Sequence, residues 1–368
     1  MGEVLIGTSG YSYRDWVGPV YPAGSPSGDF LRLYSQRFRF VELNFSYYRM
    51  PEADLLKGMQ RTVDSFGAMA TLGASELPAA GADTGSGDLA TPGAGTGFRG
   101  FRFAIKGHRS LTHERPGGEK LQRDAEAFRR GVSPLLQAGS LAAVVLQFPY
   151  SFHYTDENRR YLDALCMALA DLPLVVEFRS LDWLRGSVAL GLRDRGAGLV
   201  AVDAPSLPGL PGAEVSTDLA LQAADAEAAG PNTADPMAAA TPNTAAPTAV
   251  ATPDTAAPTA VATPDTAAPT AVATLDTAAP SPVLQTQPGA ITYVRFHGRN
   301  SETWWEGTNV TRYDYRYSDT ELSEWVPRIR ALQGASRILL IAFNNHAAGK
   351  AVQAAERLQQ LLMPEKAD

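Results

Sequence analysis

Leu174-Val175-Val176-Glu177-Phe178-Arg179-Ser180 sets a pattern that the rest of the chain repeats. A short apolar run rich in β-branched residues predicts a strand that is buried on both faces. Alternate residues of a strand share a face, so Glu177 and Arg179 lie on the same face as Val175. A buried charge is costly unless it is paired. The segment therefore ends either in a structural ion pair or in part of a functional site.

Seven further segments of this kind occur along the chain, and helical spacing follows most of them. The predicted strands are residues 4–10, 40–45, 101–106, 141–149, 174–179, 199–203, 291–297 and 338–344. The predicted helices are residues 30–38, 51–66, 119–137, 155–170, 182–195, 320–332 and 348–362. After the sixth strand we expect only one or two helical turns, within residues 219–229.

Strand–helix alternation implies right-handed parallel crossovers, and eight units close a (β/α)₈ TIM-like barrel. The rival is an open doubly wound sheet, which favours a G-x-G-x-x-G turn after its first strand. Gly7-Thr8-Ser9-Gly10 lacks that spacing. We therefore predict an α/β fold with one barrel domain over residues 1–366, interrupted by two disordered insertions.

Two composition shifts mark these insertions. Residues 67–97 are rich in Gly, Ala, Ser and Thr and are expected to be flexible. Residues 207–288 are rich in Ala, Pro and Thr, with an 11-residue repeat that begins at Thr241, Thr252 and Thr263 and, in degraded form, at Thr274. Each repeat has too little apolar surface to offset chain entropy, so we expect a disordered tether rather than a solenoid.

The whole-chain composition narrows the class of protein. The 368 residues are 45% hydrophobic and carry a net charge of −7, which weighs against a general nucleic-acid partner. A lone cysteine, Cys166, excludes an internal disulfide and suits a reducing compartment; helical spacing around it indicates an inert buried thiol. The chain shows neither a basic leader nor an apolar run of about 20 residues. We expect a cytoplasmic protein without a membrane partner, and the sequence leaves its oligomeric state open.

The predicted strands carry polar residues near their carboxyl ends, where (β/α)₈ enzymes place their chemistry. These residues, strand by strand, are Ser9, Glu42 with Asn44, Lys106, Gln147, Glu177 with Arg179, Asp203, Arg295 with His297, and Asn344. In the sixth strand Asp203 is expected to share the inner face with Leu199 and Ala201. The alternative interpretation is that pairs such as Glu177–Arg179 and Glu42–Arg295 are structural ion pairs that satisfy only each other. A complete ring of such groups costs stability unless it serves a function.

Several motifs resemble the DUF72 (YecE-like) family and cover nearly the whole chain outside the insertions. They are Ile6-Gly7-Thr8-Ser9-Gly10-Tyr11-Ser12-Tyr13, Val41-Glu42-Leu43-Asn44, Gln147-Phe148-Pro149, Val176-Glu177-Phe178-Arg179, Arg295-Phe296-His297-Gly298-Arg299 and Phe343-Asn344-Asn345-His346. The resemblance implies a TIM barrel and leaves the activity open, because no activity is established for that family. This sequence differs by its two insertions, by Ser46 where Thr is commoner, and by Tyr150 where a second Pro is common.

The residue types at the predicted mouth favour an enzyme that uses acid/base chemistry on a small anionic substrate, phosphorylated compounds included. Glu42 or Glu177 is the expected base, and Lys106 or His297 the acid or electrostatic stabiliser, with Asp203 a third carboxylate. Arg179 and Arg295 are the expected anion clamp. The remaining predicted ligand-binding residues are Ser9, Tyr11, Asn44, Gln147, Arg299, Asn344 and Asn345, and Tyr13, Trp16 and Trp183 are candidate walls.

Other readings of the same residues stay open. A barrel that binds a ligand or acts as an adaptor without turnover is the first alternative, and a phosphodiester or nucleic-acid processing barrel is the second. Glu42, Glu177, Asp203 and His297 are suitable ligands for a divalent metal, but no short ligand spacing occurs and four nearby cations oppose a metal. We therefore expect no cofactor. The turn 344–350 offers helix amides to a phosphate or, alternatively, an Asn N-cap.

Overall fold

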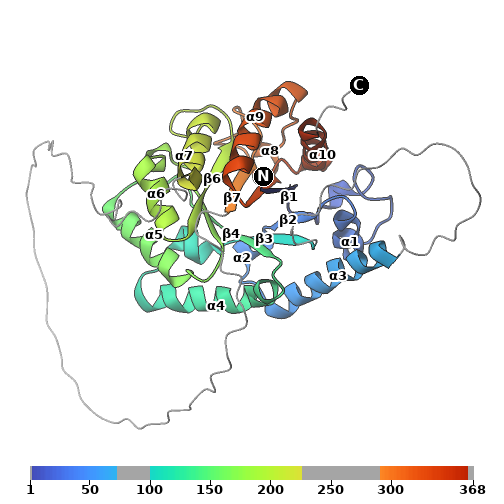
Figure 1. Cartoon of the computed structure of the whole chain (residues 1–368), viewed down its shortest axis with the longest axis horizontal. Coiled ribbons are helices and arrows are strands. Elements are labelled where there is room, and N and C mark those ends of the chain that lie inside the picture. The colour runs from blue at the N-terminus through green and yellow to red at the C-terminus, as the bar shows by residue number, and fades with distance from the viewer. Residues whose placement is uncertain (1, 73–99, 226–290, 364–368) are drawn as a thin grey trace, which may run out of the picture.

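The computed structural model describes residues 2–72, 100–225 and 291–363. Eight parallel strands pair in sequence order and close into a barrel, and helices surround them (Figure 1). The strands are β1 (Glu3–Ser9), β2 (Phe40–Leu43), β3 (Arg102–Lys106), β4 (Leu141–Gln147), β5 (Leu174–Glu177), β6 (Ala197–Asp203), β7 (Ile291–Phe296) and β8 (Ile338–Phe343). The predicted (β/α)₈ barrel is confirmed.

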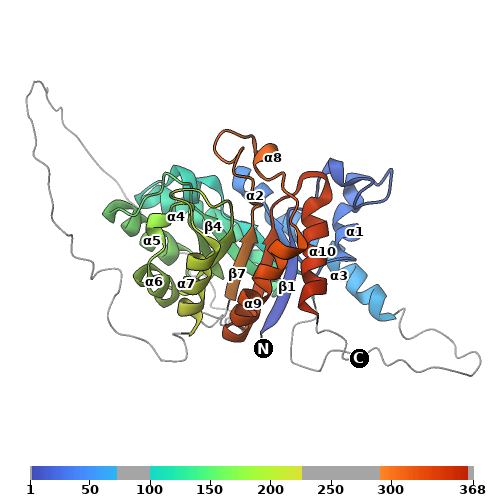
Figure 2. The same cartoon turned by 90° about the horizontal axis from the view of Figure 1, so that it is seen from above.

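Each strand is followed by a helix that packs on the outside of the barrel. These helices are α1 (Phe30–Ser35), α3 (Ala53–Leu72), α4 (Gly118–Gln137), α5 (Asp156–Ala168), α6 (Gly186–Asp194), α7 (Ala213–Asp225), α9 (Asp319–Ala335) and α10 (Lys350–Leu362). Two short helices, α2 (Phe45–Tyr48) and α8 (Asn309–Arg312), lie at one end of the barrel, opposite the amino terminus (Figure 2). In the described ranges no helix is long and apolar enough to cross a membrane.

The boundaries of both predicted insertions need correction. Helix α3 runs to Leu72, past the predicted insertion start at residue 67. Helix α7 occupies residues that were assigned to the tether, and it packs on β6 through buried Ala220 and Ala223. The small side chains of α7 let the helix lie close to β6. A stretch rich in such residues is also typical of low-complexity sequence. Residues 207–212, also assigned to the tether, are described as a turn before α7, and Leu210 is buried there. The rest of the predicted insertions, including the repeats, lies outside the described residues.

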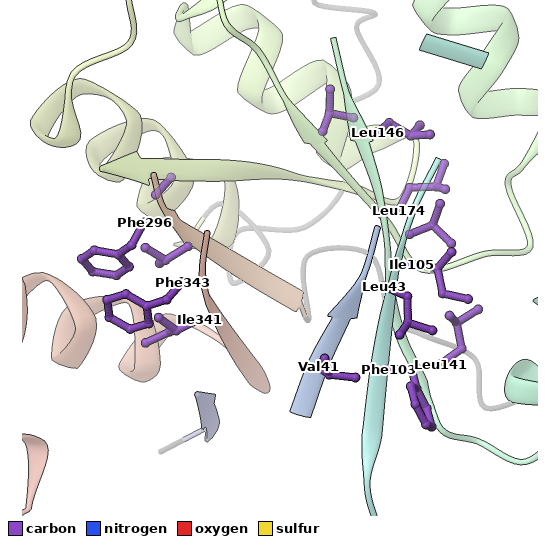
Figure 3. Close-up of a cluster of buried hydrophobic side chains, with 14 of the residues drawn as sticks. Val41, Leu43, Phe103, Ile105, Leu141, Leu146, Leu174, Phe296, Ile341 and Phe343 are labelled. Atoms are coloured by element: carbon purple, nitrogen blue, oxygen red, sulfur yellow. The ribbon is translucent and has the colours of Figure 1, made fainter. Parts of the chain in front are cut away.

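Two separate apolar clusters hold the barrel together. The larger one lies between the strands and the helices and includes Val41, Phe103, Phe296 and Phe343 (Figure 3). The smaller one fills the interior: Leu5, Phe40, Ala104, Ala142, Ala143, Val145, Val175, Val200, Val202, Tyr293, Leu340 and Ala342. Close packing on both faces of each strand explains why the strands are apolar nearly throughout.

The strand register sets which polar residues of neighbouring strands lie side by side. Pairing sets Ser9 beside Glu42, Gln147 beside Glu177, and Arg295 beside Ala342. Strand β6 differs from the prediction, because Val200 and Val202 lie in the inner cluster whereas Leu199 and Ala201 lie in the outer one. Asp203 consequently points away from the barrel interior. Both faces of β6 are apolar, so its alternation gave no indication of which face is inside.

Candidate functional site

A buried arginine between two buried glutamates forms the floor of the site. Arg295 Nη2 lies 2.6 Å from Glu42 Oε1, and its Nη1 lies 2.5 Å from Glu177 Oε2. Arg295 is 1% exposed and both glutamates are fully buried. Strands β2, β5 and β7 therefore meet at one charge cluster inside the upper barrel. Surrounding carboxylates hold the pKa of Arg295 above its ordinary value despite burial.

The remaining lone pairs of Glu42 are taken by neutral hydroxyl donors. Tyr293 OH donates to Oε2 at 2.8 Å, and Ser9 Oγ donates to Oε1. Asn44 Nδ2 in turn donates to Ser9 Oγ at 2.9 Å. Burial and the nearby Glu42 raise the pKa of Tyr293 far above the usual phenol value, so this hydroxyl remains a donor.

Glu177 is held by a second set of donors. Arg179 Nε lies 2.7 Å from Oε1, and His297 Nε2 lies 3.1 Å from the same oxygen. Burial alone would raise the pKa of Glu177, but Arg295, Arg179 and His297 outweigh it and the pKa falls well below 4.5. Glu177 is an ionised and weakly basic carboxylate in this setting.

His297 is neutral at physiological pH. Burial, followed by the charge of Arg179, lowers its pKa to about 3. Asn344 Nδ2 lies 3.2 Å from Nδ1, which fits an imidazole that accepts at Nδ1 and donates its Nε2–H to Glu177. His297 therefore orients Glu177 and does not add a charge.

Above this floor, a cavity of about 680 Å³ opens at the carboxyl ends of the strands. Its cations are Lys106, Arg179, Arg295 and Arg312, and its imidazoles are His113 and His346. Carboxamides line it at Asn44, Gln147 and Asn344, and aromatic rings at Tyr11, Tyr13, Phe45, Tyr47, Tyr48, Tyr150, Trp304, Trp305 and Tyr313. Among the described residues that line this cavity, none is Asp or Glu.

Lys106 is the cavity's titratable amine. Its Nζ donates to Gln147 Oε1 at 2.8 Å and lies 4.6 Å from the centre of the Tyr47 ring. No carboxylate in the described part of the chain lies within 4.0 Å of Nζ. Burial, followed by repulsion from Arg295, lowers the pKa of Lys106 to about 7. The amine is thus close to half-protonated at neutral pH.

Arg312 is a second cavity cation, one that the sequence analysis missed. It belongs to α8, and its Nη2 has a 3.4 Å contact with the Gly307 carbonyl. No ion pair joins Arg312 to a carboxylate of the described residues, and its Nε has no hydrogen-bond partner among them. Arg312 ends a four-residue helix that shows no periodicity in the sequence, so only its position next to Tyr313 could have drawn attention to it.

Aromatic side chains wall the cavity. Tyr13 stacks on His346 with ring centres 4.6 Å apart, and the Arg179 guanidinium lies 5.4 Å from the Trp304 ring. Tyr150 meets Trp305 edge-on at 5.0 Å. Trp16 and Trp183, predicted as walls, are instead fully buried outside the cavity. The indole of Trp183 packs between other rings, and that of Trp16 donates to the His346 carbonyl.

Asp203 and Arg299 lie outside the cavity, although the sequence placed them in it. Asp203 accepts from Trp325 Nε1 at 2.7 Å and Tyr317 OH at 2.6 Å, on the outer side of the barrel. Arg299 Nη2 lies 2.8 Å from Asp203 and 2.9 Å from Glu324. This cluster attaches the loop after β7 to α9.

The turn that opens α10 also differs from the prediction. Asn345 is fully buried and donates to the Tyr315 carbonyl, away from the cavity. The N-cap of α10 is Gly349, without a side-chain cap, so the predicted Asn N-cap is wrong. The amide of Ala348 already donates to the Asp15 carboxylate at 2.7 Å, which leaves less room for a phosphate there.

The predicted site residues fall into three groups. Tyr11, Asn44, Lys106, Gln147, Arg179, Arg295 and Asn344 line the cavity; Ser9, Glu42, Glu177 and His297 lie beneath it; Asp203, Arg299 and Asn345 lie elsewhere. The described residues contain no group of three or more His, Cys, Asp or Glu side chains arranged to hold a metal ion. The roles of the predicted site residues in binding or catalysis remain predictions.

Fold and site together define the class of the protein: a closed (β/α)₈ barrel with a cationic, aromatic-walled cavity at its carboxyl end. The chain belongs to the family described as "Protein of unknown function DUF72", which it matches over residues 5–70 and 96–368. It is 22% identical to the UPF0759 protein YunF of Bacillus subtilis (strain 168), over 98% of this chain and 94% of YunF.

Two solved structures share the fold. A DUF72 family protein from Thermotoga maritima MSB8 is 27% identical, with a TM-score of 0.60, and the match covers 98% of this chain and 99% of that one. A DUF72 family protein from Enterococcus faecalis V583 is 17% identical, with a TM-score of 0.61, over 99% of this chain and 100% of that one. The predicted family membership is confirmed.

Proposed function

We propose that the protein is an enzyme that binds a small anionic substrate in the cavity and transfers a proton through Lys106. One observation carries the proposal: four Lys or Arg side chains line the cavity, and no described lining residue is acidic. A concave site with an excess of cations and flat aromatic walls suits phosphorylated or carboxylated compounds with a ring or a carbon skeleton.

The cations differ in how free they are to bind a substrate. Arg295 is balanced by Glu42 and Glu177, so it supports the floor and is a poor anion clamp. Arg179 also forms an ion pair with Glu177, but part of its guanidinium faces the cavity, where Nη2 lies 3.5 Å from Tyr313 OH. We therefore assign the anion to Arg179 and Arg312 in place of the predicted pair Arg179 and Arg295.

Proton transfer is assigned to Lys106 because its pKa of about 7 suits an acid and a base at neutral pH. Glu42 and Glu177 are enclosed by donors and fully buried, which makes them positioning residues in this proposal. The same enclosure favours the alternative of a binding barrel without turnover, since neither carboxylate reaches the cavity.

The first test measures the melting temperature of the full chain at low salt with rising pyrophosphate, using equal ionic strength of sodium chloride as the reference. Ligand binding to the folded state raises stability by RT ln(1 + [L]/Kd), so pyrophosphate should raise the melting temperature. Arg312→Gln should lose most of this rise. Arg330→Gln, at an exposed position on α9, is the control.

Three outcomes decide between the readings. No rise with pyrophosphate, or an equal rise in Arg312→Gln, would contradict anion binding in the cavity. A rise without turnover of any phosphorylated or carboxylated compound in a substrate panel would favour the binding barrel. Turnover that disappears in Lys106→Met, while the pyrophosphate response persists, supports the enzyme.

A further inference from the structure

Lysine is rare in this chain, and Lys106 is unlike the others. Of 32 lysines and arginines only five are lysines, at positions 57, 106, 120, 350 and 366. Lys57 is exposed, Lys120 pairs with Asp124, and Lys350 pairs with Asp314. Lys106 alone among the four described lysines lines the cavity. A chain that otherwise favours arginine has an amine at this one internal position.

The surroundings of this amine favour its neutral form. Gln147 presents a neutral acceptor to Nζ, and its own Nε2 donates to the Phe148 carbonyl at 2.8 Å, which fixes the carboxamide oxygen toward Lys106. Burial, followed by the Arg295 charge and to a smaller extent the Arg179 charge, acts against protonation of the amine and outweighs the Glu177 and Glu42 carboxylates, which favour it. A lysine that served only to attract an anion would be better placed in water, where it stays charged.

An unprotonated lysine in a partly desolvated cavity beside other cations is a nucleophile toward carbonyl carbon. We propose that Lys106 forms an imine with a carbonyl substrate that also carries a phosphate or carboxylate, held by Arg179 and Arg312. This inference rests on the proposed function and names its substrate class: small anionic aldehydes or ketones.

The step balances without an oxidant or a reductant. The Nζ lone pair forms a bond to the carbonyl carbon, and the carbonyl π electrons move to oxygen. A proton passes from nitrogen to that oxygen to give a carbinolamine. The carbon–oxygen bond then breaks with further protonation, so amine and carbonyl compound give imine and water. The resulting C=N bond withdraws electrons from the adjacent carbon. Enzymes that form such adducts use this electron withdrawal in catalysis.

The test traps the imine in the full chain. Glycolaldehyde phosphate and sodium cyanoborohydride are added at pH 7.5, and peptide mass spectrometry measures the reduced adduct at each lysine over time. Lys106 should be labelled at least tenfold faster than Lys57. Unphosphorylated glycolaldehyde should label Lys106 several-fold more slowly at the same concentration, because it lacks the group that the arginines bind.

Matched variants keep the result interpretable. Lys106→Met should lose the fast adduct while its melting temperature stays at or above that of the parent, and Lys57→Arg should leave labelling of Lys106 unchanged. Labelling of Lys106 at the rate of Lys57, or equal rates with both aldehydes, would overturn the inference. The pyrophosphate response of the same samples reports separately on anion binding, so failure of the imine and failure of the proposed function are distinguishable.

Discussion

Single side chains explain why the upper barrel tolerates so much charge. Arg295 connects Glu42 and Glu177, and Arg179 adds a second cation to Glu177. Two carboxylates therefore face two guanidinium groups, and the buried cluster is close to neutral. Buried pairs of this kind add little net stability, but removing one partner leaves an uncompensated charge. Lys106 differs from these groups, because in its protonated form it adds a positive charge that no directly paired carboxylate balances.

This excess charge makes a prediction about stability and pH. The folded pKa of Lys106 is about 7 against 10.5 for an unperturbed lysine, so the folded state disfavours the charged amine. The unfolded state binds more protons between these two values, and stability rises as pH rises through that window. Lys106→Met should therefore stabilise the protein by about 2 to 5 kcal/mol below pH 7, with the gain shrinking toward pH 10.

Urea unfolding at pH 6, 8 and 9.5 measures this difference. Lys57→Met, at an exposed site, should change stability by no more than about 0.5 kcal/mol at every pH. A Lys106→Met difference that is the same at all three values would contradict the lowered pKa. The proposals for proton transfer and imine formation would then lose their chemical basis.

The predicted residues that line the cavity or lie beneath it follow from strand periodicity. Glu42, Lys106, Gln147 and Glu177 point as the alternation of their strands indicates, because one face of each strand carries the charged or amide group. Asp203 was misplaced because β6 is apolar on both faces. Arg312 was missed because its four-residue helix α8 is too short to show a period in the sequence.

Secondary-structure elements show the same contrast between pattern and composition. Strong apolar periodicity predicted seven outer helices. Helix α7 instead falls in the Ala-, Pro- and Thr-rich stretch assigned to the tether, where only one or two helical turns were expected within residues 219–229. Its place is set by a tertiary contact: β5 pairs with β6 only from Leu174 to Val176, so the upper part of β6 lacks that neighbour. The Val202 amide donates instead to Ser216 Oγ on α7, at 3.1 Å.

This contact predicts a measurable role for Ser216. Ser216→Ala removes the acceptor and leaves the buried Val202 amide without its partner, which should cost about 1 to 3 kcal/mol in the free energy of unfolding. Ser133→Ala, on α4 with a more exposed hydroxyl, is the matched control and should cost less than about 0.5 kcal/mol. Urea denaturation of both variants checks this. Equal stability of the two would mean that α7 does not replace the missing strand contact.

Considered as one chain, the barrel has its cavity at the end opposite the described helix-to-strand junctions. Strands β3 and β7 begin at the amino-terminal end of the barrel, and helices α3 and α7 run toward that end. The cavity lies at the opposite end, where α2 and α8 are found (Figure 2). The family match omits residues 71–95 and runs through residues 226–290.

Replacing residues 226–290 by a Gly/Ser linker of about ten residues should therefore leave both fold and anion response intact, because short helix-to-strand connections suffice in α/β units. We expect the free energy of unfolding to rise by about 1 to 2 kcal/mol, since the cost of loop closure falls by roughly (3/2)RT ln(65/10) when 65 residues become about ten. The pyrophosphate-dependent rise in melting temperature should equal that of the full chain. A shortened chain that folds but loses this rise would show that residues 226–290 contribute to binding; one that retains it assigns recognition to the barrel alone.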